Sequence, residues 1–169
     1  MPQRFLRNST VKVAELLQQT ISELAALRRG VVTAEIMLMT LIEQQDSIFL
    51  KILDELRRDT DETRRHVVDK LMQTVGEIPQ LQFGHAAAMK ISQEVQKLFE
   101  HADKERANLE DSYISTAALL LAFFNDNVGS CKSILEAEGL SYAEMLKALK
   151  QLRGNSKIVE KDSESRASL

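Results

Sequence analysis

Two stretches of sequence decide the fold: VTAEIMLMTLI at residues 32–42 and ISTAALLLAFF at residues 114–124. The second begins 82 residues after the first. Each opens with a β-branched residue and a hydroxyl-bearing helix cap, followed by a run that is apolar on almost every side. A helix of that kind is typical of the centre of a domain, so the pair predicts two buried helices in one core.

The same 82-residue shift aligns the two halves of the chain without a gap. Most of the matching positions are apolar or helix-capping, which means that a fold pattern is duplicated. The identical pairs include Val13/Val95, Leu16/Leu98, Glu23/Glu105, Ala25/Ala107, Leu27/Leu109, Leu38/Leu120, Ile52/Ile134, Leu53/Leu135 and Glu62/Glu144. Such a repeat predicts two supersecondary units that bury their apolar faces against each other. It favours a scaffold with a groove over an enzyme with a pocket.

Each half predicts four helices in the same order, giving an all-α fold of two tandem pseudo-symmetric four-helix repeats. The expected N-caps are Thr10, Thr33, Ser47 and Asp59 in the first half and Ser92, Ser115, Ser130 and Ser141 in the second. We expect one domain over residues 1–154, with repeats at about 5–78 and 83–154 joined by a turn-forming segment. Residues 155–169 are polar and charged, and predict a flexible linker or tail. The sequence leaves open whether Leu169 is the natural end of the protein.

Composition narrows the class of protein. The chain is rich in Leu, Ala, Glu, Lys, Gln and Met and poor in Gly, Pro and aromatic residues, which favours helix and argues against a sheet. The net charge of −3 gives no reason to expect nucleic acid or a membrane surface as a partner. A single cysteine fits a reducing compartment, and the first residues lack the apolar stretch of a secretory signal. We therefore expect a soluble, cytoplasmic, helical domain that is a monomer in isolation.

Residues with the potential for catalysis are sparse. His66, His85 and His101 have no metal-ligand spacing with one another or with Cys131, so no metal site is expected. We expect a solvated His66 and an inert, partly buried Cys131 thiol. The chain has no phosphate-binding GxxxxGK[ST] loop and therefore no cofactor or ATPase site of that kind. Catalysis by this chain is disfavoured.

The chain has more large apolar side chains than short helices need. Two interpretations are open: ordinary core packing, or an adaptable apolar groove between the halves that binds varied partners. The residues in question are Met37, Met39, Phe83, Met89, Phe99 and Met145.

Together these motifs resemble the N-terminal domain of the Clp-type AAA+ chaperones. The family's repeat motif, V/I-[TS]-x-E-H-L-L-x-A-L-L, stands here at residues 32–42 and 114–124. The hinge IPQL at residues 78–81 is similar to the family's L-P-x-V link between repeats. The ending LRGNSKIV at residues 152–159 resembles the L-R-G-G-x-x-V segment that leads out of the N-domain in the ClpB disaggregase branch.

The resemblance implies a mobile module that recognises exposed apolar segments of unfolded or aggregated polypeptides and passes them to ATPase rings. ATP would be bound elsewhere in the parent, which the resemblance implies is a hexamer. It also carries over site residues. Thr10 and Ser92 match paired capping hydroxyls, Asp111 matches an acid before the second motif, and Phe99 and Ala118 match apolar positions that line the groove.

The departures from the family motif concern charge. Ile36 and Ala118 replace the motif histidine, and the motif glutamate is kept as Glu35 but becomes Ala117 in the second repeat. In the ClpC-like branch these glutamates read phosphorylated arginine, so the loss of one favours an apolar groove here. The alternative hypothesis is an adaptor-docking or regulatory N-domain of a Clp protease unfoldase, or a free-standing regulator, that binds adaptor proteins.

Overall fold

The computed structural model describes residues 2–81 and 89–165, and this part of the chain holds nine α-helices. The first half contains α1 (Pro2–Arg7), α2 (Val11–Ala26), α3 (Ala34–Glu43), α4 (Ile48–Glu55) and α5 (Thr60–Met72). The second contains α6 (Gln93–Asn108), α7 (Thr116–Ala122), α8 (Cys131–Ala137) and α9 (Tyr142–Arg153). Helices α2–α5 and α6–α9 are the four expected in each half, so the all-α repeat fold is confirmed.

Hydroxyl and carboxylate side chains begin most of these helices, as predicted. The Thr10 hydroxyl accepts a hydrogen bond from the amide of Val13 at 3.3 Å, and the Asp59 carboxylate accepts one from Glu62 at 3.0 Å. Thr33, Ser115 and Ser141 cap α3, α7 and α9 in the same way. Three predicted caps differ. Ser47, Ser92 and Ser130 occupy the N-cap position, but their side chains make no capping bond.

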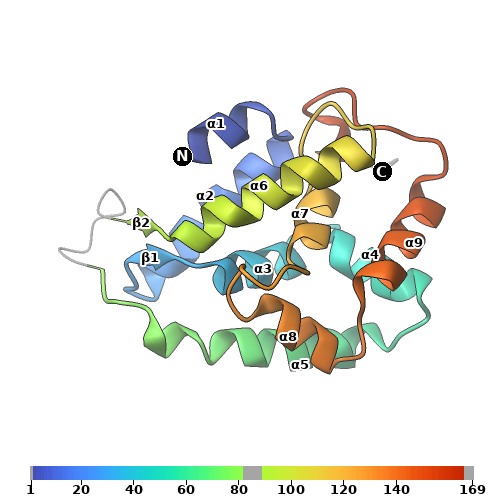
Figure 1. Ribbon diagram of the computed structural model, residues 1–169. Coiled ribbons are helices and arrows are strands. Elements are labelled where there is room, and N and C mark those ends of the chain that lie inside the picture. The colour runs from blue at the N-terminus through green and yellow to red at the C-terminus, as the bar shows by residue number, and fades with distance from the viewer. Residues whose placement is uncertain (1, 82–88, 166–169) are drawn as a thin grey trace.

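Helices α3 and α7 form the centre of the core. Every side chain of α7 is buried, and so are seven of the ten residues of α3. Figure 1 shows these two helices between a layer that contains α2 and α6 and a layer that contains α5 and α8. Met37, Met39, Phe99 and Met145 all lie in this core, which confirms the core-packing interpretation for them. Met89 is half-buried, and Phe83, Gly84 and His85 lie outside the described residues.

The two halves pack against each other through their third and fourth helices. The third helix of each half packs against the fourth helix of the other, so that α4 contacts α9 and α5 contacts α8. Arg58, in the turn after α4, donates hydrogen bonds to the carbonyl oxygens of Glu138 at 3.2 Å and Gly139 at 2.7 Å. The halves are therefore parts of one core.

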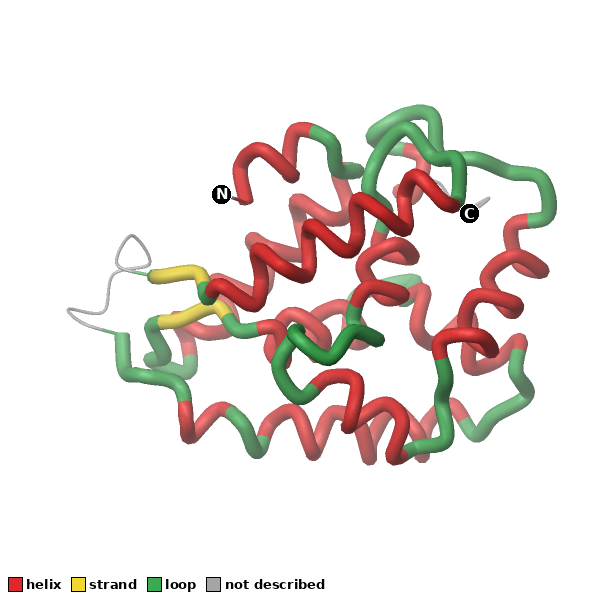
Figure 2. The backbone as a smooth tube through the Cα atoms, viewed as in Figure 1, coloured by secondary structure: helices red, strands yellow, loops and turns green. Residues whose placement is uncertain are grey.

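A short parallel sheet also joins the halves, against the expectation from composition. Strands β1 (Val31–Val32) and β2 (Lys90–Ile91) pair side by side, as Figure 2 shows. Each strand follows or precedes a helix of the repeat and consists of only two residues. A pairing this short leaves no alternating pattern in the sequence.

Residues 155–165, here called the C-terminal strap, follow a defined path over the body. Ile158 is 2% exposed and Ser163 is 7% exposed. The strap ends in a single 3₁₀ turn, η4 (Ser163–Ser165), that contacts α2. Sequence analysis predicts a flexible linker or tail from residue 155, and in the structure residues 155–165 lie against the body through anchors such as Ile158 that sequence periodicity does not reveal. The boundaries of the two repeats stay a prediction.

One backbone position makes the packing between halves testable. Gly129 has φ +60°, and a Cβ atom there would overlap the carboxylate of Glu35. That carboxylate is held by the amide and the hydroxyl of Ser130, both at 2.8 Å, and has little freedom to move. Gly129 is thus the residue that lets Glu35 bridge the two halves.

We expect Gly129→Ala to lower the free energy of unfolding by about 2 kcal/mol or more, through left-handed backbone strain and overlap. Urea denaturation measures the loss. Gly76→Ala is the matched control, because nothing lies within 4 Å of a Cβ at Gly76. In a Glu35→Ala background the cost of Gly129→Ala should shrink. An equal cost in both backgrounds would show that the overlap contributes nothing.

Candidate functional site

The structure gathers several predicted site residues at one junction between the halves. Thr10 at the start of α2 is fully buried, and its amide donates to the carbonyl of Ile114 at 2.9 Å. That bond sets the start of α2 beside the start of α7. The hydroxyl of Thr10 donates to Glu164 of the strap, and the amide of Thr116 donates to both oxygens of the same carboxylate at 3.0 Å.

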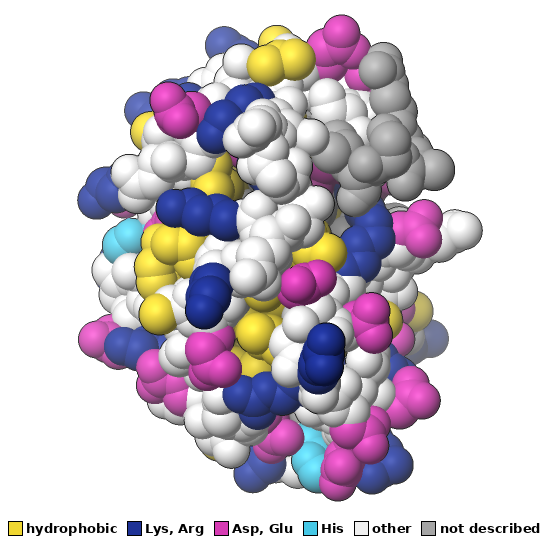
Figure 3. All heavy atoms as spheres, turned by 90° about the vertical axis from the view of Figure 1, so that its right-hand side faces the viewer, with side chains coloured by type: hydrophobic (Ala, Val, Ile, Leu, Met, Phe, Trp, Pro, Cys, Tyr) yellow, Lys and Arg dark blue, Asp and Glu magenta, His cyan; other side chains and the backbone are white. Residues whose placement is uncertain are grey.

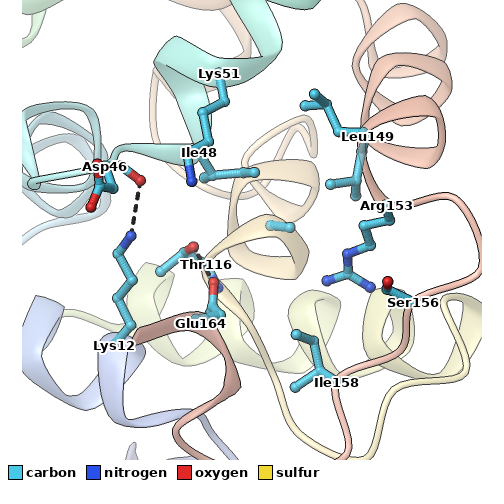
Figure 4. A pocket seen from close by; sticks show the side chains of 12 residues that line it. Lys12, Asp46, Ile48, Lys51, Thr116, Leu149, Arg153, Ser156, Ile158 and Glu164 are labelled. Carbon is cyan, nitrogen blue, oxygen red and sulfur yellow. Dashed lines mark hydrogen bonds between the residues drawn. The ribbon is translucent and has the colours of Figure 1, made fainter. Parts of the chain in front are cut away.

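A small pocket of about 120 Å³ lies next to this junction, between α2, α4, α7, α9 and the strap. Figure 4 shows Lys12, Thr116 and Glu164 on one side and Leu149, Arg153 and Ile158 on the other. Lys12 donates to the carbonyl of Asp46 at 2.9 Å. Burial lowers the pKa of Lys12 from its ordinary value, with the nearby Glu164 carboxylate acting in the opposite direction. The pocket thus combines apolar walls with charges of both signs.

The face that carries α9 has apolar and charged side chains, as the pocket does. Figure 3 shows apolar side chains in the middle of this face, interrupted and surrounded by basic and acidic ones. Leu152 of α9, which lines the pocket, is 43% exposed.

Asp111 is a buried residue that links several segments at this junction. Its carboxylate side chain is completely buried and pairs with Arg153, whose Nη1 lies 3.0 and 2.8 Å from the two carboxylate oxygens. The same carboxylate accepts a hydrogen bond from the amide of Ile158 at 2.9 Å. Arg153 also donates to the hydroxyl of Ser115, which caps α7. Asp111 therefore acts on the fold in this structure, and a role in ligand binding stays a prediction.

Ser92 and Glu35 lie at the corresponding junction of the other half, which differs in charge. There Glu35 bridges to Ser130, and Glu94 occupies the repeat position of Lys12. Burial and, to a smaller extent, the Glu35 charge raise the pKa of Glu94. The hydroxyl oxygen of Ser92 is buried and has no hydrogen-bond partner within the described residues. A cavity of about 220 Å³ beside these residues is lined by Glu35, Glu77 and Glu94. The junction around Glu35 is therefore acidic, whereas the junction around Glu164 carries charges of both signs.

Phe99 and Ala118 do not line a surface groove, so that expectation is corrected. Both side chains are fully buried. The ring of Phe99 stacks on Phe5 of α1, with 5.8 Å between ring centroids and 20° between planes. Helix α1 is not predicted by the sequence pattern, and it covers the side of α6 on which a groove was expected.

An apolar groove does exist, but on a different face. It has a volume of about 470 Å³, runs along α2 beside α1, and is lined mostly by apolar residues. Its apolar residues are Leu6, Val11, Ala14, Leu17 and Ile21, with Glu15, Gln18 and Gln19 at the edge. Val11, at the start of α2, is 40% exposed. The sequence pattern does not reveal this groove, because one of its walls is helix α1, which the pattern does not predict.

The chemically reactive side chains are engaged or buried. Cys131 is buried, and burial raises the pKa of its thiol well above the ordinary value, as its predicted inertness requires. His66 is exposed at the surface as expected, with its ring nitrogen Nδ1 3.1 Å from Glu138. Across residues 2–81 and 89–165 no group of His, Cys, Asp and Glu side chains has the arrangement of a metal site. None of the helices in the same ranges is long and apolar enough to cross a membrane.

Comparison with known sequences points to one family. The model of the Clp repeat (R) N-terminal domain matches residues 8–162. The chain is 25% identical over 162 residues to chaperone protein ClpB of Bacillus anthracis, covering 95% of this chain and 18% of that protein. It is 23% identical over 139 residues to the chloroplastic ClpB3 of Arabidopsis thaliana, covering 82% and 14%. The chain thus spans less than a fifth of the length of these relatives.

Solved structures share the fold. The N-terminal domain of Hsp104 from Candida albicans superposes with a TM-score of 0.72 at 19% identity, covering 91% of this chain and 97% of that one. The N-terminal domain of the ClpV1 ATPase from E. coli gives 0.68 at 18% identity, with 90% of each chain covered. The ClpD N-terminal domain from Arabidopsis thaliana gives 0.57 at 19% identity, covering 86% and 98%.

The buried ion pair of Asp111 can be tested directly. We expect Asp111→Ala to lower the free energy of unfolding by about 3 kcal/mol, because it leaves Arg153 without its buried partner. Asp103→Ala is the control, since Asp103 forms a comparable pair with Arg106 but its side chain is 44% exposed. Urea denaturation should show less than about 1 kcal/mol for the control. Equal losses would contradict the structural role assigned to Asp111.

Proposed function

Because the chain belongs to the Clp repeat (R) N-terminal domain family, we propose that it is the substrate-recognition domain of a ClpB-type disaggregase. In this proposal it binds exposed apolar segments of unfolded or aggregated polypeptides and delivers them to ATPase rings. Those rings, and the hexamer they form, belong to parts of the parent protein outside this chain. The support is the family membership, the ClpB relatives and the likeness to the Hsp104 N-domain.

The apolar groove along α2 is the observation that supports the proposed polypeptide-binding surface. Apolar side chains from α1 and α2 line it, among them the exposed Val11, and Glu15 is its one charged lining residue within the described chain. A short apolar stretch of an unfolded chain fits such a groove by burying hydrophobic surface, with little demand on its sequence. That combination suits a domain that recognises many different polypeptides weakly.

The second candidate is an adaptor-docking or regulatory role, and the ClpV1 and ClpD N-domains favour it because they share the fold. In that case the mixed-charge junction around Lys12 and Glu164 would bind one folded partner through polar contacts. Salt separates the two candidates. Apolar binding along α2 keeps its affinity as salt rises, whereas polar docking weakens.

The groove is tested with Val11→Ser. We expect the dissociation constant for a permanently unfolded, reduced and carboxymethylated protein to rise about fivefold, since half-burial of a valine side chain contributes about 1 kcal/mol. Fluorescence anisotropy with a labelled unfolded protein measures the constant. Met72→Ser is the matched control, because Met72 is 39% exposed on α5, away from the groove, against 40% for Val11.

Thermal unfolding of each variant checks that both remain folded. If Val11→Ser and Met72→Ser changed the dissociation constant equally, the groove along α2 would not be the binding surface. Binding that disappeared at high salt would favour the adaptor-docking role instead.

A further inference from the structure

Besides the buried Ser163, two residues tie the C-terminal strap to the body through hydrogen bonds of their own. The first is Ile158, which is 2% exposed and uses both of its backbone polar groups. Its amide donates to the Asp111 carboxylate at 2.9 Å, and its carbonyl accepts from the amide of Ser112 at 2.7 Å. Both partners lie in the segment between α6 and α7. This anchor is buried and depends on the core ion pair.

The chain just beyond Ile158 is more exposed to solvent. Residues 159–162 are exposed, and Val159 is 62% exposed although it is apolar. Within this stretch the carbonyl of Lys161 accepts a hydrogen bond from the amide of Val11 at 2.7 Å. The Lys161 ammonium also lies 5.7 Å from the centre of the Tyr113 ring, within the range of a weak cation–π contact.

The second anchor is the carboxylate of Glu164. It accepts hydrogen bonds from the hydroxyl of Thr10 and from both the amide and the hydroxyl of Thr116. Thr116 is the first residue of α7, so its amide has no partner inside the helix. Figure 4 shows Glu164 directed at Thr116, with Lys12 beside it. The Glu164 charge acts to raise the pKa of Lys12, against the larger effect of burial. One side chain thus satisfies three donors on two helices.

Thr10 and Thr116 are buried, but the donors that Glu164 would leave lie beside a pocket. The pocket of about 120 Å³ is lined by Thr116 and Glu164 themselves, so water can reach the donors as the carboxylate leaves. Thr10 keeps its capping bond to the amide of Val13. Segments that are held by few buried contacts open locally, at a lower free energy than the whole fold.

We propose that residues 159–165 are a releasable latch: Glu164 holds them on α2 and α7, and its departure frees them as a unit while Ile158 stays in place. The latch closes one side of the pocket when seated. Extended, it adds up to roughly 25 Å to the connection between the domain body and whatever the chain joins. Only this last consequence rests on the proposed function, because release itself is a property of this domain alone.

Amide hydrogen exchange by NMR tests the latch with reporters in the same molecule. The amides of Val11 and Thr116 donate to the latch, and the amide of Ser112 donates to the Ile158 anchor. In Glu164→Ala we expect exchange at Val11 and Thr116 to accelerate about tenfold or more, because charge-assisted hydrogen bonds are lost. Exchange at Ser112 stays unchanged. The amide of Val11 is the decisive reporter, since it donates to the carbonyl of Lys161 and not to the Glu164 carboxylate.

The matched control is Glu136→Ala, which removes an exposed glutamate of α8 and should leave all three amides as they are. The amide of Leu119 inside the core reports on global stability. Unchanged exchange at Val11 in Glu164→Ala would overturn the latch, as would an equal acceleration at Val11 and Ser112. Loss of polypeptide binding in Val11→Ser concerns the α2 groove, so the two proposals can fail separately.

Discussion

The ion pair between Asp111 and Arg153 holds together the part of the structure on which the rest depends. A carboxylate with no exposed surface is costly to bury unless all of its oxygens are engaged. Here Arg153 and the amide of Ile158 engage them, and Arg153 reaches on to the cap of α7. One buried charge therefore fixes the end of α9, the start of α7 and the first anchor of the strap. All three contribute residues to the lining of the pocket beside Glu164.

Local chemistry made most of the helical architecture predictable from the sequence. Thr10, Thr33 and Asp59 begin helices through bonds to an amide three residues on, and that spacing is visible in the chain itself. Because the sequence repeats, each helix is predicted from two separate stretches of the chain. What escaped prediction depends on contacts between distant residues. Helix α1 is too short to show a period, and it is recognisable only by the stacking of Phe5 on Phe99.

The candidate site was predicted less well than the fold, for the same reason. Thr10 and Asp111 were named only as matches to family positions; both are buried polar residues where the halves meet, and their part in binding stays a prediction. The sequence assigned Phe99 to a groove because an apolar residue on a helix face has the same pattern whether solvent or another helix covers it. Glu164 was missed altogether, because a lone glutamate in a polar segment carries no signal until its partners are placed.

The packing of helices across the two halves has a consequence for how far the two halves can differ in sequence. Contacts of α4 with α9 and of α5 with α8 are reciprocal, as at the interface of a two-fold symmetric dimer. The chain is in effect such a dimer fused end to end, and fusion removes the requirement that both subunits stay alike. Lys12 could then diverge from Glu94, and Ala117 from Glu35, without disturbing the shared interface. The two halves can therefore keep one interface while one junction is acidic and the other carries charges of both signs.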